Sequence, residues 1–379
     1  MSTPALLICL FLTAGQDELI PVGQENWEKP WVPDLRKPDA KIDIPLNKRI
    51  DVLILGDGYL ASERADFEKE VREWYDRFLT YTPWSQFRGA FRVRGYWTAS
   101  EGRATPERKS VYQLPATTTG VGDVSQPKLA DAVFAALDKA GVNRAAARSR
   151  LSHAVPVLLV RNEQVRNPSG LTRLLTSSDA KASVSVAFAA YTHHEFGHAY
   201  GGLRDEYINL TGGKAPPRSG GKPNLFTLSN VTSTKDPAQL AWSHLLPGGA
   251  LNPAKESVIG LLWIGGGGEE GFWHSEVRCL MNGTHDNWDL QKSKRGINLR
   301  DMNRFCFWCE ELMVARTLQK TGRLGDSEDG ETLWKKWTDE FRPLYQKSFD
   351  VAGRLRAKNE ENAKAKLAEA KIYEQPGKN

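Results

Sequence analysis

Residues 194–207 read His194-Glu195-Phe196-Gly197-His198-Ala199-Tyr200-Gly201-Gly202-Leu203-Arg204-Asp205-Glu206-Tyr207. Residues four apart on a helix share one face, so His194 and His198 can present two imidazole nitrogens to one metal ion. Glu195 follows the first histidine, where it can accept a proton from a water whose pKa the ion has lowered. The stretch therefore predicts a helix that carries a catalytic zinc site.

The same stretch predicts where this helix ends. If the helix continued, Asp205 would lie roughly 16 Å along its axis from His194, too far to share a metal ion with it. Glycine readily adopts the left-handed conformation that ends helices and reverses the chain, and Gly201-Gly202 supplies it. The reversal would bring Asp205 or Glu206 back as the third ligand.

The residues around the motif favour a metal site over a chance pattern. Val184 to Tyr191 is an apolar run that we expect to bury the helix carrying the two histidines. The alternative is a chance His-Glu-x-x-His on a solvated helix, because the five-residue pattern alone is common. The Gly-Gly break and the acidic pair that follow, in a chain with only seven histidines, favour the metal. A purely structural zinc site would take four protein ligands and no free acid beside the ion.

Strand and helix patterns alternate along the N-terminal half. Short runs rich in apolar residues predict buried strands at Arg49–Leu55, Phe91–Trp97 and Ala154–Val160. Ser62 is expected to cap a helix between the first two strands, and Lys128 to Ala140 predicts a second helix. The apolar face of the first helix comprises Phe67, Val71, Trp74 and Phe78. This order of elements indicates an α/β fold.

The first fifteen residues have most features of a signal peptide. Ala5 to Leu12 is an apolar run, and the small residues Thr13-Ala14-Gly15 follow, as expected before cleavage at Gln16. The positively charged N-terminal region that signal peptides usually have is missing, because no Lys or Arg precedes Lys29. A cytosolic chain with an apolar start is the alternative. We expect a secreted or periplasmic protein.

Composition excludes other classes of protein. The net charge of +5 is small for 379 residues and does not indicate a nucleic-acid partner. Forty per cent hydrophobic residues and twelve Trp predict a globular core. No segment reaches the length of a transmembrane helix, so no integral membrane segment is expected.

Three cysteines stand late in the chain, at Cys279, Cys306 and Cys309. They lie within thirty-one residues of one another, so we expect them to meet in space. Export favours a disulfide or simple packing. A structural zinc ion is the alternative, and it would need a fourth ligand such as His274 or His285.

The C-terminal part differs in composition from the rest. Residues 331–379 are charged and helix-prone, and the last thirty indicate a solvated, partly frayed helix or tail. We therefore expect a signal peptide at 1–15, an extended lead-in at 16–45, a catalytic domain at 46–320 and a charged helical extension at 321–379.

Five segments together resemble the IgA-type metallopeptidase family, zinc endopeptidases of bacteria related to the metzincins. The segments are Asp51–Tyr59, His194–Tyr207, Glu269–Gly271, Cys279–Met281 and Phe305–Cys309, and the resemblance covers roughly residues 46–320. It implies an α/β (α+β) catalytic domain with a mixed sheet and an active-site helix. It also implies one catalytic zinc ion and a protein or peptide substrate.

The resemblance assigns roles to single residues. His194 and His198 would bind zinc, and Glu195 would be the general base. The acidic ligand of the family falls on Asp205, but metzincins usually place their third ligand where this chain has Arg204. Glu206 therefore remains a rival of Asp205. Met281 resembles the methionine that lies beneath the metal in metzincins.

Substrate contacts are less well defined. His193, Arg204 and Tyr207 are candidates for stabilising negative charge on the substrate by their proximity alone. The stretch Asn162–Arg173, where a glycine-rich edge strand would hold the substrate, contains only one glycine. Two alternatives to an endopeptidase remain: a zinc hydrolase of a non-peptide amide or ester, and a catalytically silent binding protein on the same fold.

Overall fold

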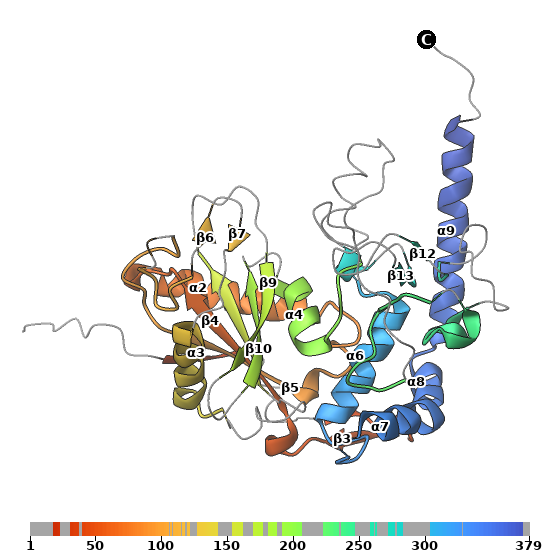
Figure 1. Cartoon of the computed structure of the whole chain (residues 1–379), viewed down its shortest axis with the longest axis horizontal. Coiled ribbons are helices and arrows are strands. Elements are labelled where there is room, and N and C mark those ends of the chain that lie inside the picture. Colours follow the sequence, from red (N-terminus) through yellow and green to blue (C-terminus); the bar gives the residue numbers. More distant parts are fainter. Residues whose placement is uncertain are drawn as a thin grey trace, which may run out of the picture.

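A six-stranded mixed sheet forms the centre of one side of the protein in the computed structural model (Figure 1). The structure describes residues 18–22, 31–37, 40–105, 107, 109–114, 116–117, 120–121, 127–142, 154–161, 170–176, 181–187, 192–206, 223–234, 236–246, 258–260, 262–263, 272–276, 279–282, 304–327 and 329–373. The expected signal peptide lies outside these residues.

The strand order of the sheet is β1-β5-β4-β8-β10-β9. The four inner strands are parallel: β5 (Phe91–Trp97), β4 (Ile50–Asp57), β8 (Ala154–Val160) and β10 (Lys181–Ala187). The two edge strands are antiparallel to their neighbours: β1 (Glu18–Pro21) and β9 (Gly170–Thr176). The three expected strands and the mixed sheet are confirmed.

Helices cover both faces of this sheet, which explains the nearly continuous apolar strands. Along β4, Val52 and Ile54 face one core and the alternating Leu53 and Leu55 face another. The first core is shared with α2 (Arg64–Phe78), and the second with α3 (Pro127–Lys139). The apolar face expected for α2 is buried as predicted.

The start of α2 differs from the prediction. Ser62 lies inside a 3-10 turn, η2 (Ala61–Glu63), and Glu63 occupies the N-cap position. The Glu63 carboxylate accepts a hydrogen bond from the Leu60 backbone N–H at 2.8 Å. This bond closes the start of η2, and α2 itself begins without a side-chain cap hydrogen bond, so the expected serine cap is wrong.

The apolar run before the motif begins in a strand. Its first residues, 184–187, belong to strand β10, and the motif helix α4 (Thr192–Gly201) begins later. Strand β10 contacts α4, so this part of the run lies against the motif helix, as predicted. Residues 188–191 lie outside the described part.

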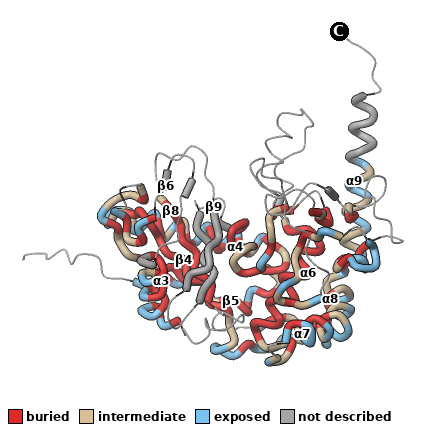
Figure 2. Tube along the Cα trace, in the orientation of Figure 1, coloured by how far each residue is buried: buried red, intermediate tan, exposed pale blue. Residues whose placement is uncertain are grey.

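A fully buried helix, α6 (Phe307–Lys320), forms the core of the other side of the protein. Figure 2 shows α6 and β4 as buried segments, one on each side of α4. The C-terminal helices α7 (Gly330–Lys336), η10 (Trp337–Phe341) and α8 (Arg342–Ser348) pack around α6. The helix α9 (Val351–Tyr373) follows and projects away from the body (Figure 1).

The expected boundary at residue 320 does not separate two cores. Trp334, Trp337 and Tyr345 belong to the same apolar cluster as α4, α6 and one face of the sheet. The lead-in is likewise tied to the body, because β1 pairs with β5 and Ile20 is buried.

Short elements complete the described chain. The short strands are β2 (Trp31–Pro33), β3 (Lys41–Asp43), β6 (Ala116–Thr117), β7 (Gly120–Val121), β11 (Val231–Thr232), β12 (Leu262–Trp263) and β13 (Trp273–His274). The further 3-10 turns are η1 (Leu46–Lys48), η3 (Arg88–Ala90), η5 (Pro237–Gln239), η6 (Ser243–Leu245) and η8 (Leu280–Asn282). None of the described helices combines the length and the apolar character needed to cross a membrane.

Candidate active site

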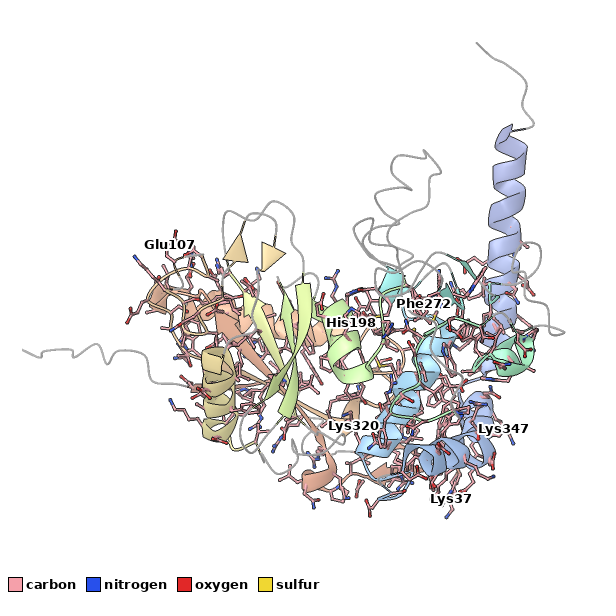
Figure 3. The ribbon with its side chains drawn as sticks, viewed as in Figure 1. Lys37, Glu107, His198, Phe272, Lys320 and Lys347 are labelled. Atoms are coloured by element: carbon pink, nitrogen blue, oxygen red, sulfur yellow. The ribbon has the colours of Figure 1, made fainter. Side chains whose placement is uncertain are left out.

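Helix α4 is held in place by its aromatic face. Phe196 is buried and meets Trp74 and Trp84 edge-on, with ring centroids 5.6 and 5.1 Å away. Tyr200, one turn later, stacks on Phe196 at 5.4 Å. Because Phe196 and Tyr200 point into the core, His194 and His198 lie on a different face of the helix. In the view of Figure 3, His198 lies between the sheet and the segment that carries Phe272.

The chain reverses directly after α4, as the glycine pair predicts. Gly202 has a φ of +55°, in the left-handed region that favours glycine. Its N–H donates to the His198 carbonyl at 2.8 Å, and the Leu203 N–H reaches the Gly197 carbonyl at 3.3 Å. These bonds close the helix and direct the following residues back alongside it.

The reversal brings Asp205 to the two histidines. Asp205 Oδ1 lies 2.9 Å from His194 Nε2 and 3.1 Å from His198 Nε2, and the two Nε2 atoms are 3.1 Å apart. Ligands of a tetrahedral zinc ion with bonds of about 2.0–2.1 Å are separated by roughly 3.3 Å. The three atoms thus form a nearly equilateral triangle of the size that one zinc ion requires.

The other nitrogen of each imidazole is already engaged. His194 Nδ1 donates to the Leu280 carbonyl at 2.8 Å, and His198 Nδ1 donates to the Leu203 carbonyl at 2.7 Å. Hydrogen bonds of this kind set the tautomer and direct Nε2 toward the metal position. These carbonyls could not be predicted from sequence, because a backbone acceptor can belong to any residue type.

Charges at the site favour a bound cation. Burial opposes a charge on His198, but the carboxylates of Asp205 and Glu195 outweigh it and raise the pKa of His198 to about 9. Burial alone would raise the pKa of Asp205, but the two imidazoles hold it below its usual range. The carboxylates thus stabilise positive charge at the point where the three ligand atoms converge.

Glu195 lies beside the triangle and outside it. Its carboxylate is buried, and one of its oxygens lies within 4.8 Å of ligand atoms of both histidines. Among the described residues, these three side chains form one of two groups that could hold a metal ion. The second group comprises Glu206 and the three late cysteines.

Met281 lies directly beneath the motif helix, between the two histidine positions. A methyl group added to Gly197 would lie 2.7 Å from Met281 Sδ and 3.3 Å from Phe305 Cε1. Met281 is fully buried, and its carbonyl accepts from the Glu206 N–H at 2.9 Å. Glycine at position 197 therefore permits the close approach of helix and methionine.

This contact predicts the effect of a small substitution. Gly197→Ala should destabilise the protein by about 1–2 kcal/mol, because the overpacking cost exceeds the better helix propensity of alanine. Urea unfolding measures the change in free energy. In a Met281→Ala background the same substitution should cost nothing or stabilise the protein. An equal cost in both backgrounds would contradict the contact.

The other residues proposed from sequence are placed differently. His193 points into the core, stacks on Trp74 at 4.7 Å and donates from Nε2 to the Trp74 carbonyl at 3.0 Å. Burial lowers the pKa of His193 to about 3, so its imidazole is neutral and structural. The Arg204 guanidinium lies over the Phe272 ring at 5.8 Å. Tyr207 lies outside the described residues.

Glu206 turns away from the histidines. It is fully buried, and its Oε1 accepts from Asn230 Nδ2 at 2.9 Å. Burial raises the pKa of Glu206 well above its usual range. Asn230 also pairs with both backbone groups of Arg204, which fixes the loop after α4. No sequence motif pointed to Asn230.

The three late cysteines meet, as expected, and of the predicted outcomes the disulfide is absent. Cys279, Cys306 and Cys309 are buried and none is disulfide-bonded. The Cys279 and Cys309 sulfurs lie 3.8 Å apart, whereas a disulfide needs about 2.05 Å. His285, one candidate fourth ligand, lies outside the described residues.

Comparison with known proteins identifies the family to which the chain belongs. No curated protein matches the chain. Residues 42–257, more than half of the chain, match the family described as IgA Peptidase M64. The matched segment contains strand β4, helix α4 and Asp205. The chain therefore belongs to the IgA Peptidase M64 family and is a peptidase.

Proposed function

We propose that the protein is a zinc-dependent endopeptidase whose metal is held by His194, His198 and Asp205. The observation that carries this proposal is the triangle of two Nε2 atoms and one carboxylate oxygen, with both Nδ1 atoms engaged by backbone carbonyls. Three protein ligands leave a fourth position for water or substrate, as in catalytic zinc sites. Asp205 is preferred to Glu206 because only Asp205 touches the histidines.

Glu195 is the proposed general base. One of its carboxylate oxygens lies within 4.8 Å of the ligand atoms of both histidines, and Glu195 is not one of the three proposed ligands. When bound, zinc would supply Lewis acidity, which acidifies a water and polarises the scissile carbonyl. Glu195 would accept the proton of that water and later deliver it to the leaving amine.

Strand β9 supports an extended peptide as substrate. It is an edge strand of the sheet and contacts α4. Part of the expected substrate-binding stretch, residues 170–173, lies in β9, while residues 162–169 lie outside the described part. An extended peptide can add to such an edge through backbone hydrogen bonds, which depend little on side chains. Sequence preference would then come from neighbouring loops.

The metal assignment is tested by Asp205→Asn. Changing a residue that merely orients a ligand lowers metal affinity 10–100-fold, so losing a ligand carboxylate should lower zinc affinity at least about 100-fold. Zinc competition with a chromophoric chelator measures affinity, and cleavage of a denatured mixed-protein substrate measures activity. Asp326→Asn, at an exposed ion pair with Lys48, is the matched control. Unchanged zinc affinity in Asp205→Asn would refute the ligand set.

We also propose that the protein is exported. The apolar run at residues 5–12 and the small residues after it support a signal peptide. Expression in a bacterial host, followed by fractionation and N-terminal sequencing, should give a periplasmic or secreted chain that begins at Gln16. A cytoplasmic chain that keeps residue 15 would contradict export.

A further inference from the structure

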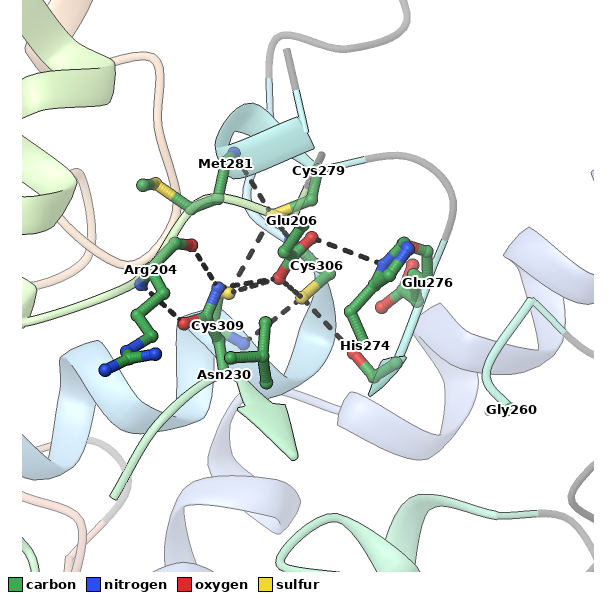
Figure 4. A network of polar contacts seen from close by, with 12 residues as sticks. Arg204, Glu206, Asn230, Gly260, His274, Glu276, Cys279, Met281, Cys306 and Cys309 are labelled. Atoms are coloured by element: carbon green, nitrogen blue, oxygen red, sulfur yellow. Dashed lines mark hydrogen bonds and ion pairs between the residues drawn. The ribbon is translucent and has the colours of Figure 1, made fainter. Parts of the chain in front are cut away.

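A second cluster of metal-binding side chains lies behind the active site. Glu206, Cys279, Cys306 and Cys309 come from three separate segments, and each is fully buried. Their ligand atoms all lie within 4.8 Å of one another. Figure 4 shows the four side chains pointing toward one centre, with Asn230 and His274 beside them.

The distances within the cluster fit one tetrahedral ion. Two sulfurs on a zinc ion with bonds of about 2.3 Å lie roughly 3.8 Å apart, and a sulfur and a carboxylate oxygen roughly 3.6 Å apart. The sulfurs of Cys279 and Cys309 are 3.8 Å apart. The Glu206 Oε1 atom lies 3.3 Å from the Cys309 sulfur and 3.9 Å from the Cys306 sulfur.

Backbone amides are directed at the sulfurs, as they are around bound thiolates. The Cys279 sulfur accepts from the Met281 and Cys306 N–H groups, both at 3.4 Å. The Cys306 sulfur caps α6 and accepts from the Cys309 N–H at 3.3 Å. Cysteines at a helix N-terminus favour the thiolate, which is the form that binds metal.

The carboxylate supplies an independent observation. Glu206 Oε2 is buried and accepts no hydrogen bond among the described residues. His274 Nδ1 lies 3.7 Å from this oxygen, beyond hydrogen-bond distance, and few buried polar atoms of native proteins lack a hydrogen bond. A divalent cation at the centre of the cluster would coordinate the carboxylate and the thiolates and offset part of their negative charge.

We propose that Cys279, Cys306, Cys309 and Glu206 bind a second, structural zinc ion. Four protein ligands and complete burial leave no open position, so this site would stabilise the fold and take no part in catalysis. The inference stands apart from the proposed peptidase mechanism, because none of the four residues belongs to the triangle around His194.

The proposed ion would connect the two metal sites. Glu206 follows Asp205 directly, and Cys279 lies two residues before Met281. The Glu206 N–H donates to the Met281 carbonyl at 2.9 Å, so both segments are already tied together. The second zinc ion would therefore fix the loop that delivers Asp205 and the turn beneath α4.

Cobalt substitution tests the site without relying on activity. The His194→Ala/His198→Ala variant of the full chain removes the first site and should retain about one metal ion per chain. After exchange with cobalt alone, this variant should show thiolate-to-cobalt charge transfer and the strong visible bands of a tetrahedral site. Absence of the charge-transfer band would overturn the proposal.

Single substitutions then assign the ligands. In the same background, Cys309→Ser and Glu206→Ala should each lose the metal or bind it at least about tenfold more weakly. His274→Ala is the matched control, because its side chain is buried beside the cluster and outside the proposed ligand set. If His274→Ala loses the metal and Glu206→Ala keeps it, Glu206 is not the fourth ligand.

A titration on unaltered cysteines covers the case in which these variants do not fold. In the His194→Ala/His198→Ala background with Cys9→Ser, an organic mercurial should release about one zinc ion as it saturates the three thiols. A zinc-sensitive dye follows the release. Uptake of the mercurial with no zinc released would show thiols that are merely packed, and would overturn the proposal.

Discussion

Glu195→Gln is expected to lower kcat/KM for peptide hydrolysis by a factor of about 10² to 10⁴, the range that general-base catalysis contributes. Glutamine keeps the size and one oxygen of the side chain but cannot accept a proton at neutral pH. The zinc content should stay unchanged, because the three proposed ligands are His194, His198 and Asp205. The measurement pairs initial rates on a fluorogenic peptide with metal analysis of the same sample.

Glu73→Gln is the control for that experiment, since Glu73 lies on an exposed face of α2 and pairs with the exposed Lys69. Its activity should match that of the wild type. A Glu195→Gln variant that binds zinc and keeps more than a tenth of the activity would remove Glu195 from the role of base. A variant that loses zinc would instead make Glu195 part of the metal site.

Glu311→Ala is expected to destabilise the protein by about 3–5 kcal/mol, because it removes a buried carboxylate and leaves the half-buried Arg342 guanidinium and the buried Trp337 N–H without their acceptor. The Glu311 side chain is 2 % exposed. Its carboxylate accepts hydrogen bonds from His244 Nε2 at 2.7 Å, Arg342 Nε at 2.6 Å and Trp337 Nε1 at 3.3 Å. One side chain of α6 thus holds η6, η10 and α8 together.

Urea unfolding of the full chain measures this loss. Glu360→Ala, at an exposed position on α9, should change the free energy of unfolding by less than about 0.5 kcal/mol. If the free energy of unfolding of Glu311→Ala is lower than that of the wild type by less than about 1 kcal/mol, the C-terminal helices do not depend on this network.

The parts of the fold that the sequence predicted are those in which a local pattern has one physical solution. The apolar run of β4 between polar and glycine residues permits little except a buried strand. The spacing of four between His194 and His198 permits one shared helix face. Strand β10 was missed because a short apolar run can belong to a buried helix as well as to a strand, and β9 overlaps the stretch expected to hold an edge strand only at residues 170–173.

The choice between Asp205 and Glu206 depended on tertiary geometry. Both residues follow the same glycine turn, and only the dihedral angles at Gly202 and the pairing of Asn230 decide which carboxylate meets the histidines. The state of the three late cysteines could not be predicted for a different reason. The spacing of Cys306 and Cys309 fits a disulfide partner, a metal and simple packing equally well, and only distances in space separate these cases.

The hydrogen bond from His194 to the Leu280 carbonyl spans 86 residues of sequence, and the contact from Glu206 to Cys306 spans 100. Closing such long loops costs conformational entropy, and this cost is offset only once the contacts have formed. These long-range contacts therefore form late when a chain folds. In an unfolded chain, each proposed site offers zinc only one pair of ligands close in sequence, His194 with His198 and Cys306 with Cys309. Tight zinc binding should therefore appear with the last kinetic phase of refolding, and zinc should not act as the nucleus from which the protein folds.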